Sequence, residues 1–237
     1  MSKKFPLLSF LTVLITVLTP LLSYAINIPG TSDPWLAGMP NGSTASLSDS
    51  APGQSPVLVT GLNLSLGGTI SFSVSGAVFH DPCCTPIGPD GGGFISHFTG
   101  AENGISDIVV PIDALIGVFL DVNQPDTSPA PTALDFSVSG TGFNSLAPGL
   151  KQTFFIGDGI TGTGSGNVQT FVIPTGATRL FLGTMDGFGW SNNIGSFDVT
   201  ATQSGGTTTS VSEPNPLLLL TLGLFFFGIA KRYLFQM

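Results

Sequence analysis

Short runs in which apolar and polar residues alternate, with little helical periodicity, most constrain the fold of this 237-residue chain. In the clearest run, 69–78, Ile70, Phe72 and Val74 alternate with serines. A period of two places successive side chains on opposite faces of a β-strand. The run 115–122 is apolar throughout, which predicts a buried strand.

Six more segments are short apolar or alternating blocks bounded by Gly, Pro, Asn or Asp: 57–64, 133–138, 152–156, 168–173, 178–183 and 195–201. About eight short strands with turn-rich connections are typical of an all-β fold. We expect an antiparallel β-sandwich over residues 26–203, which is long enough for one domain with its own core.

The distribution of charge excludes one class of partner. The chain has 14 Asp+Glu and 6 Lys+Arg, a net charge of −8, and four of the bases lie at its two ends. The segment from Asp33 to Asp198 holds 13 acids and two bases, Lys151 and Arg179, so its net charge is 2 − 13 = −11. Nucleic-acid binding needs basic residues to neutralise phosphates, so it is not expected. An acidic surface suits cations, calcium in particular.

The N-terminal segment 1–25 has the pattern of a secretory signal peptide that signal peptidase removes. Lys3 and Lys4 precede an apolar stretch, and Ser23-Tyr24-Ala25 places small residues at the positions read by the peptidase. The alternative is an N-terminal membrane anchor. The interruption of the apolar stretch by Pro20 favours the signal peptide.

The C-terminal segment 212–237 has three parts after a flexible linker at 204–211. Glu213 and Pro214 form a hinge, an apolar run follows at 217–230, and the basic pair Lys231 and Arg232 comes next. As a helix the run would span about 21 Å, short for a hydrocarbon core of about 30 Å. The basic pair would remain on the cytoplasmic side.

This order resembles the sorting signal of PEP-CTERM proteins, in which Val211-Ser212-Glu213-Pro214 stands where the family usually shows Val-Pro-Glu-Pro. The resemblance implies export by a Gram-negative bacterium, transient residence in the inner membrane and processing by the protease exosortase. The mature protein would then reach the cell surface or extracellular matrix. A plain C-terminal membrane anchor is the alternative.

Signatures of catalysis are mostly missing from the sequence. His80 and His97 are its two histidines, and neither belongs to a His-Glu-x-x-His motif. His97 and Glu102 are an available acid–base pair, but satisfied loop residues are the favoured interpretation. The adjacent Cys83 and Cys84 are either two free thiols, which we favour slightly, or a disulfide between neighbours. We therefore do not expect an enzyme.

The loop after the predicted strand 178–183 carries the most specific chemistry. It contains Asp186, Gly189, Trp190, Asn192 and Asn193. Carboxylate and amide oxygens suit calcium, a hard cation that takes six to eight oxygen ligands. The alternative, weighed equally from composition, is a turn whose side chains cap their own backbone.

The segment 186–197 resembles the C-terminal signature of the calcium-dependent galactophilic lectins of bacteria, where an Asp, a Gly-bearing loop and an amide pair precede Gly-Ser-Phe. The resemblance implies a jelly-roll-type sandwich in which one calcium ion binds sugar hydroxyls directly. It implies side-chain ligands at Asp186, Asn192 and Asn193 and a carbonyl ligand at Gly189. The Asp186–Asn192 spacing is one residue shorter than in the best-known lectin.

Two other segments extend this resemblance, 75–80 and 88–91, which are similar to an early strand and a Gly-Pro-x-Gly loop of the family. They imply a carbonyl ligand at His80 and a sugar-binding role for His97. We add Trp190 as a candidate for stacking on a sugar ring. The expected function is calcium-dependent binding of carbohydrate, with exopolysaccharide of the matrix as the expected ligand. The alternatives are a structural surface or biofilm protein of the same fold and, third, a glycan-active hydrolase.

Overall fold

The described part of the protein has an all-β fold. The computed structural model describes residues 23–46 and 48–206. Residues 1–22 of the predicted signal peptide, the segment 207–211 of the linker and the whole predicted sorting signal, with Glu213, Pro214, Lys231 and Arg232, lie outside the described residues. No helix within the described residues is long and apolar enough to cross a membrane.

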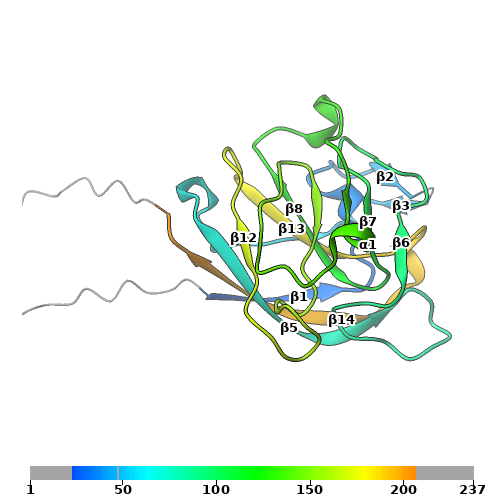
Figure 1. Cartoon of the computed structure of the whole chain (residues 1–237). Helices are drawn as coiled ribbons and strands as arrows, with labels where there is room; N and C mark the ends of the chain where they lie inside the picture. Colours follow the sequence, from blue (N-terminus) through cyan, green and yellow to red (C-terminus); the bar gives the residue numbers. More distant parts are fainter. Residues whose placement is uncertain (1–22, 47, 207–237) are drawn as a thin grey trace, which may run out of the picture.

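Two larger sheets form neighbouring layers (Figure 1). The first has the order β1-β14-β5-β12-β10 and the second has the order β11-β8-β13-β4. The strands of the first sheet are β1 (Ser23–Pro29), β14 (Ile194–Ser204), β5 (Thr69–Phe79), β12 (Thr170–Val172) and β10 (Ser145–Leu146). Those of the second are β11 (Thr153–Phe155), β8 (Leu115–Leu120), β13 (Arg179–Thr184) and β4 (Val57–Leu58). The longest pairing, between β14 and β5, is antiparallel.

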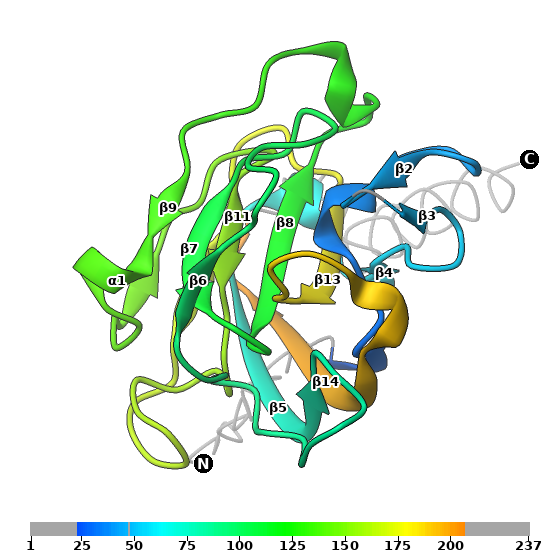
Figure 2. The same ribbon diagram turned by 90° about the vertical axis from the view of Figure 1, so that its right-hand side faces the viewer.

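Two smaller sheets and five short helical turns complete the described chain. One sheet joins β2 (Thr44–Ala45) to β3 (Asp49–Ser50), and the other has the order β6 (Phe94–Ser96), β7 (Ile108–Pro111), β9 (Leu134–Asp135). Figure 2 shows β6 and β7 in front of β11 and β8, and the β2–β3 hairpin to one side. The turns are η1 (Pro34–Leu36), η2 (Leu64–Leu66), η3 (Pro125–Thr127), α1 (Phe136–Ser139) and η4 (Trp190–Asn192).

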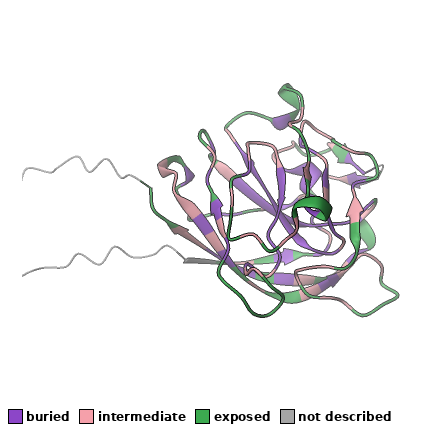
Figure 3. Cartoon of the chain, viewed as in Figure 1, coloured by how far each residue is buried: buried purple, intermediate pink, exposed green. Residues whose placement is uncertain are grey.

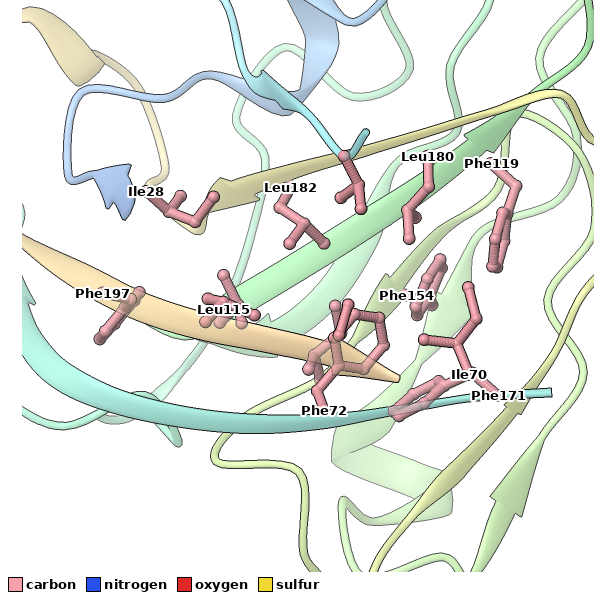
Figure 4. Close-up of a cluster of buried hydrophobic side chains, with 14 of the residues drawn as sticks. Ile28, Ile70, Phe72, Leu115, Phe119, Phe154, Phe171, Leu180, Leu182 and Phe197 are labelled. Atoms are coloured by element: carbon pink, nitrogen blue, oxygen red, sulfur yellow. The ribbon is translucent and has the colours of Figure 1, made fainter. Parts of the chain in front are cut away.

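The main hydrophobic core lies between the two larger sheets. In Figure 4 side chains of both sheets meet there, among them Phe72 and Phe197 from one sheet and Leu115, Phe119 and Leu182 from the other. All are buried (Figure 3). The alternation predicted for 69–78 is confirmed, because the residues at 70, 72 and 78 are buried and the serines between them are half-buried or exposed.

A second core lies on the other face of the β8 sheet. Every residue of β8 is buried, because alternate residues contribute to different cores. The strand predicted for 115–122 ends at Leu120, and Val122 beyond it is exposed. Leu115 and Phe119 belong to the first core, whereas Ile116 and Val118 pack with Trp35 and Trp190 in the second. A strand covered on both faces needs apolar residues at every position.

Three expectations about the ends and strands need adjustment. The predicted strand 133–138 ends at Asp135, whose carboxylate accepts the N–H of Ser137 and begins α1. Ser23–Ala25, predicted to be the end of the signal peptide, pairs with β14, so cleavage after Ala25 would remove the first three residue pairs of β1. At the other end, β14 continues to Ser204, into the predicted linker.

Candidate functional site

The predicted calcium loop connects β13 to β14 at one end of the two larger sheets. Its position is fixed on both sides. Ile194 pairs with Phe79, so Asn193 and His80 are the next residues outward on neighbouring strands. At the other end of the loop, Met185 donates its N–H to the carbonyl of Ala114 and accepts the N–H of Asp113. The sheet pairing therefore brings together segments that are far apart in the sequence.

One member of the amide pair, Asn192, contacts the carbonyl of His80, and the other, Asn193, contacts a different carbonyl. Asn192 Nδ2 lies 3.3 Å from that carbonyl oxygen. Asn193 Nδ2 donates to the carbonyl of Gly30 at 3.1 Å, which leaves Asn193 Oδ1 buried with no hydrogen-bond partner. A buried acceptor without a partner costs about 1–3 kcal/mol, so this oxygen points to a missing partner such as a cation or water.

Asp186 lies against the same amide and is largely buried. Burial raises the pKa of its carboxyl above the usual range. The N–H groups of Phe188 and Gly187, the side chain of Asn193 and the charge of His80 act in the opposite direction, because each favours the ionised carboxylate. A bound cation would favour the ionised form further.

A second carboxylate, Asp113, lies beside this site and was not predicted from the sequence. It is buried and adopts a left-handed backbone conformation, with φ of 66°. Its Oδ2 lies 2.9 Å from His80 Nδ1, while Oδ1 is buried without a partner. Burial raises the pKa of this carboxyl, and the contact with His80 lowers it. The available sequence signal was an Asp immediately before the apolar run of β8.

The donor set fits calcium better than a transition metal. Among the described residues, no three His, Cys, Asp or Glu side chains gather so that they would hold a metal ion. The loop instead offers the Asp186 carboxylate and the side-chain amides of Asn192 and Asn193, and the residue after β5 adds the His80 carbonyl. Such mixed carboxylate, amide and carbonyl sets are the ligands of calcium. The Asn192 amide would have to rotate so that its oxygen, rather than its nitrogen, faces the cation.

Gly189 stands at the N-terminal end of η4, with φ of −165°. A side chain placed there would meet no atom within 4 Å. Glycine is therefore not required at this position by local packing, and a carbonyl ligand at Gly189 remains a prediction.

The structure corrects the two predicted sugar contacts. Trp190 is 0% and His97 2% exposed, so neither ring is presented to solvent. His97 stacks on Trp35 with ring centroids 3.7 Å apart, and Trp190 Nε1 donates to the carbonyl of Thr184. The N-terminal segment that carries η1 covers both rings, which the sequence pattern of the loop did not reveal. We therefore assign Trp190 and His97 to the framework behind the loop.

His97 belongs to a buried polar network. Its Nε2 lies 2.9 Å from Ser46 Oγ and 3.7 Å from the Glu102 carboxylate, and Ser46 Oγ lies 3.2 Å from Asp33. Burial lowers the pKa of His97. The expected His97–Glu102 pair is thus formed, but His97 and Ser46 are buried, so a substrate has no access to them in this structure.

Asp90 and Asp158, two acids outside the candidate loop, stabilise turns. Asp90 Oδ1 accepts the N–H of Asp158, and the two oxygens of Asp158 accept the N–H groups of Ile160 and Gly164. Cys83 and Cys84 form a disulfide in the exposed loop after β5, so the slightly favoured expectation of two free thiols is wrong.

Exposed phenylalanines gather next to the candidate loop. Phe98 is 66% and Phe188 45% exposed, and their ring centroids lie 6.3 Å apart. Phe98 N donates to the carbonyl of Gly187, which ties the end of β6 to the loop. A third exposed phenylalanine, Phe94, is the first residue of β6, which ends two residues before Phe98. A surface hollow of about 350 Å³ lies elsewhere, lined by residues of β1, β5 and β14 that include Asn27, Ser73 and Asp198.

Comparisons of the chain with protein-family models, with curated proteins and with solved structures found no match.

Proposed function

We propose that this protein is an exported, non-enzymatic carbohydrate-binding protein that uses calcium held by the loop between β13 and β14. The observation that supports this best is the meeting of Asn192 with the His80 carbonyl beside Asp186 and the unpartnered Asn193 oxygen. In this proposal the two larger sheets form a lectin-like, jelly-roll-type sandwich. Sugar hydroxyls would complete the coordination of the ion.

Phe188 and Phe98 take the stacking role first assigned to Trp190. Phe188 lies two residues from Asp186 in the loop, and its N–H lies 3.3 Å from the Asp186 carboxylate. An exposed aromatic ring beside a polar site suits a sugar, which has both hydroxyl groups and an apolar face. The acidic charge of the domain argues against an anionic partner, so a neutral or weakly charged polysaccharide of the matrix is the proposed ligand.

The proposed route of the protein depends on its two ends. The signal peptide with its basic residues would direct export, and the segment 212–237 would be recognised by exosortase at the inner membrane. The carbohydrate-binding domain would then act at the cell surface or in the extracellular matrix of a Gram-negative bacterium.

Calorimetric titration of the mature domain with calcium tests the metal. We expect saturable heat with one ion per chain and a higher melting temperature in millimolar calcium. Asp186→Asn should abolish both effects, because it removes the carboxylate, whereas the control Asp126→Asn should not, because Asp126 is exposed and contacts Gln124. Absence of calcium heat in the wild-type domain would contradict the proposal.

A glycan array with and without a calcium chelator tests the ligand. We expect binding that requires calcium and that weakens about tenfold in Phe188→Ser, since aromatic contacts contribute up to about 1.5 kcal/mol beyond their buried area. The matched control is Val138→Ser, which changes an exposed apolar residue on α1, away from the loop.

A structural surface or biofilm protein of the same fold is the second candidate. The burial of His97 favours it, because the residue expected to contact sugar is not accessible. Calcium binding with no glycan bound on the array, and unchanged biofilm with Asp186→Asn, would support this alternative.

A further inference from the structure

The turn η4 holds the amide side of the candidate site, yet its own sequence does not fix its beginning. Its first position is preceded by Gly189, which has no side chain to accept the free N–H groups of the turn. The N–H groups at the beginning of a helical turn need acceptors from elsewhere. Asn192 and Asn193 follow within three residues, so any shift of the turn moves both amides.

Asp49 supplies the missing acceptor from β3. Its Oδ2 accepts the N–H of Trp190 at 2.8 Å, and its Oδ1 accepts the N–H of Ser191 at 3.2 Å. The residue is fully buried. Each carboxylate oxygen thus binds one N–H group of the same turn, which fixes both the position and the orientation of η4.

Asp49 is itself held firmly. It pairs with Ala45 in the β2–β3 hairpin, and residues on either side of the hairpin are joined by hydrogen bonds from Gly42 to Ala51 and from Ala51 to Ser43. Figures 1 and 2 show this hairpin at the same end of the molecule as the turn before β14. The contact also joins η4 to the second core, since Trp190 packs at 5.5 Å from Trp35.

The Asp49 carboxylate has no basic partner among the described residues and is bound by the two N–H groups of η4. Asp33 and Glu102, two further acids, and the imidazole of His97 interact electrostatically with Asp49, and among the described residues no Lys or Arg forms an ion pair with it. Burial raises the pKa of Asp49, whereas the two N–H groups lower it. A buried carboxylate without a basic partner is retained at a cost, which its hydrogen bonds offset.

We propose that Asp49 is the positioning residue of the calcium loop: its carboxylate sets the geometry of η4 and therefore the affinity of Asn192 and Asn193 for the ion. This inference rests on the proposed function. It assigns a role to the N-terminal segment that precedes the loop by 141 residues.

Asp49→Asn tests the proposal. The amide keeps one acceptor oxygen but turns an N–H₂ group toward the second backbone N–H. We expect faster amide hydrogen exchange at Trp190 and Ser191 in the metal-free protein and at least about a tenfold loss of calcium affinity, since hydrogen bonds to charged groups are the stronger class. Terbium luminescence sensitised by Trp190 should also fall at saturation, because the turn is displaced.

The matched control is Asp135→Asn. Asp135 also accepts an N–H at the beginning of a short helical turn, but that turn is α1, which Figure 2 shows on the opposite side of the molecule from the β2–β3 hairpin. Its replacement should leave the exchange at Trp190 and the calcium affinity unchanged. Asp49→Ala is a second test variant, in which both the faster exchange at Trp190 and Ser191 and the loss of calcium affinity should be larger than in Asp49→Asn.

The outcomes separate the two proposals. If wild-type protein binds neither calcium nor terbium, the proposed function fails, and the exchange experiment still decides whether Asp49 positions η4. Unchanged exchange in both Asp49 variants would overturn the positioning role. If the wild-type protein binds calcium and the Asp49 variants show faster exchange but unchanged calcium affinity, Asp49 positions η4 without affecting the calcium site, which would overturn the proposal.

Discussion

The indole ring of Trp35 stacks on the imidazole ring of His97, with 3.7 Å between their centroids and an angle of 21° between their planes. Trp35 also donates through Nε1 to the carbonyl of Ser106 and contacts Trp190 at 5.5 Å. A single residue of the N-terminal segment therefore seals the buried network and supports the framework behind the candidate loop.

Trp35→Ala should destabilise the protein by about 3–5 kcal/mol, because the ring is fully buried and its removal leaves a cavity. Trp35→Phe should cost less, since the smaller ring still fills part of the space. Urea denaturation followed by circular dichroism measures both. Equal stability of Trp35→Ala and wild type would contradict the burial of this ring.

The carboxyl of Asp33 makes the free energy of unfolding depend on pH in a direction that can be predicted. Burial raises its folded-state pKa well above the usual value, despite hydrogen bonds from Trp35 and Ser46. Between the unfolded pKa, about 4, and the raised folded pKa, the folded state binds more protons than the unfolded state. In that window the contribution of Asp33 to the free energy of unfolding rises as pH falls.

Asp33→Asn mimics the neutral carboxyl and should therefore stabilise the protein at pH 7, with a gain that shrinks as pH falls through the folded pKa. Urea denaturation of variant and wild type at several pH values measures this difference. The control Asp121→Asn should show the opposite sign, since hydrogen bonds from Asn123 lower the pKa of Asp121. A gain in Asp33→Asn that grows toward low pH would refute the assignment.

The sequence predicted the strands that carry a clear local pattern, which is either alternation or a continuous apolar run. The serine alternation of 69–78 and the apolar run of β8 are local signals, and both strands were found. Within the described residues, the strands β1, β2, β3, β6, β7 and β10 were missed. β1 overlaps the predicted signal peptide, and the others are short. β7, for example, is stabilised by pairing with β6 and β9, which the local pattern does not show.

The site was predicted where its residues are close in sequence and missed where they are remote. Asp186, Asn192 and Asn193 lie in one loop, whereas Asp113 joins it through a backbone hydrogen bond to Met185 and Asp49 through the hydrogen bonds that its carboxylate accepts. The wrong roles of Trp190 and His97 have the same origin. Their burial depends on a segment more than fifty residues away in sequence, as the contact between Ser46 and His97 illustrates.

Lys151, one of two bases between Asp33 and Asp198, stabilises a loop through backbone carbonyls. Its Nζ donates to the carbonyls of Pro125, Ser128 and Pro129 and to the Ser128 hydroxyl. Lys151→Met should leave the core intact but expose residues 121–132 to proteases, with a loss of global stability of about 1 kcal/mol. Limited proteolysis with mass spectrometry measures this. Unchanged cleavage would show that these bonds do not order the loop.

Two glycines next to the candidate site should respond differently to alanine. Gly195 has φ of +82°, and a Cβ there would lie 2.1 Å from the carbonyl oxygen of Ala77. Gly195→Ala should destabilise the protein by about 2 kcal/mol or more, because the left-handed conformation alone costs about 1–2 kcal/mol and the contact adds to it. Thermal and urea denaturation measure the loss.

Gly189→Ala is the matched variant, since the backbone there is extended and the space around the added carbon is open. Its stability should stay within about 0.5 kcal/mol of wild type. Calcium affinity should also be retained, because the predicted ligand at this position is the backbone carbonyl, which alanine keeps. Loss of calcium binding in folded Gly189→Ala, with Asp126→Asn unaffected, would show that the loop needs a conformation that only glycine adopts when the ion binds.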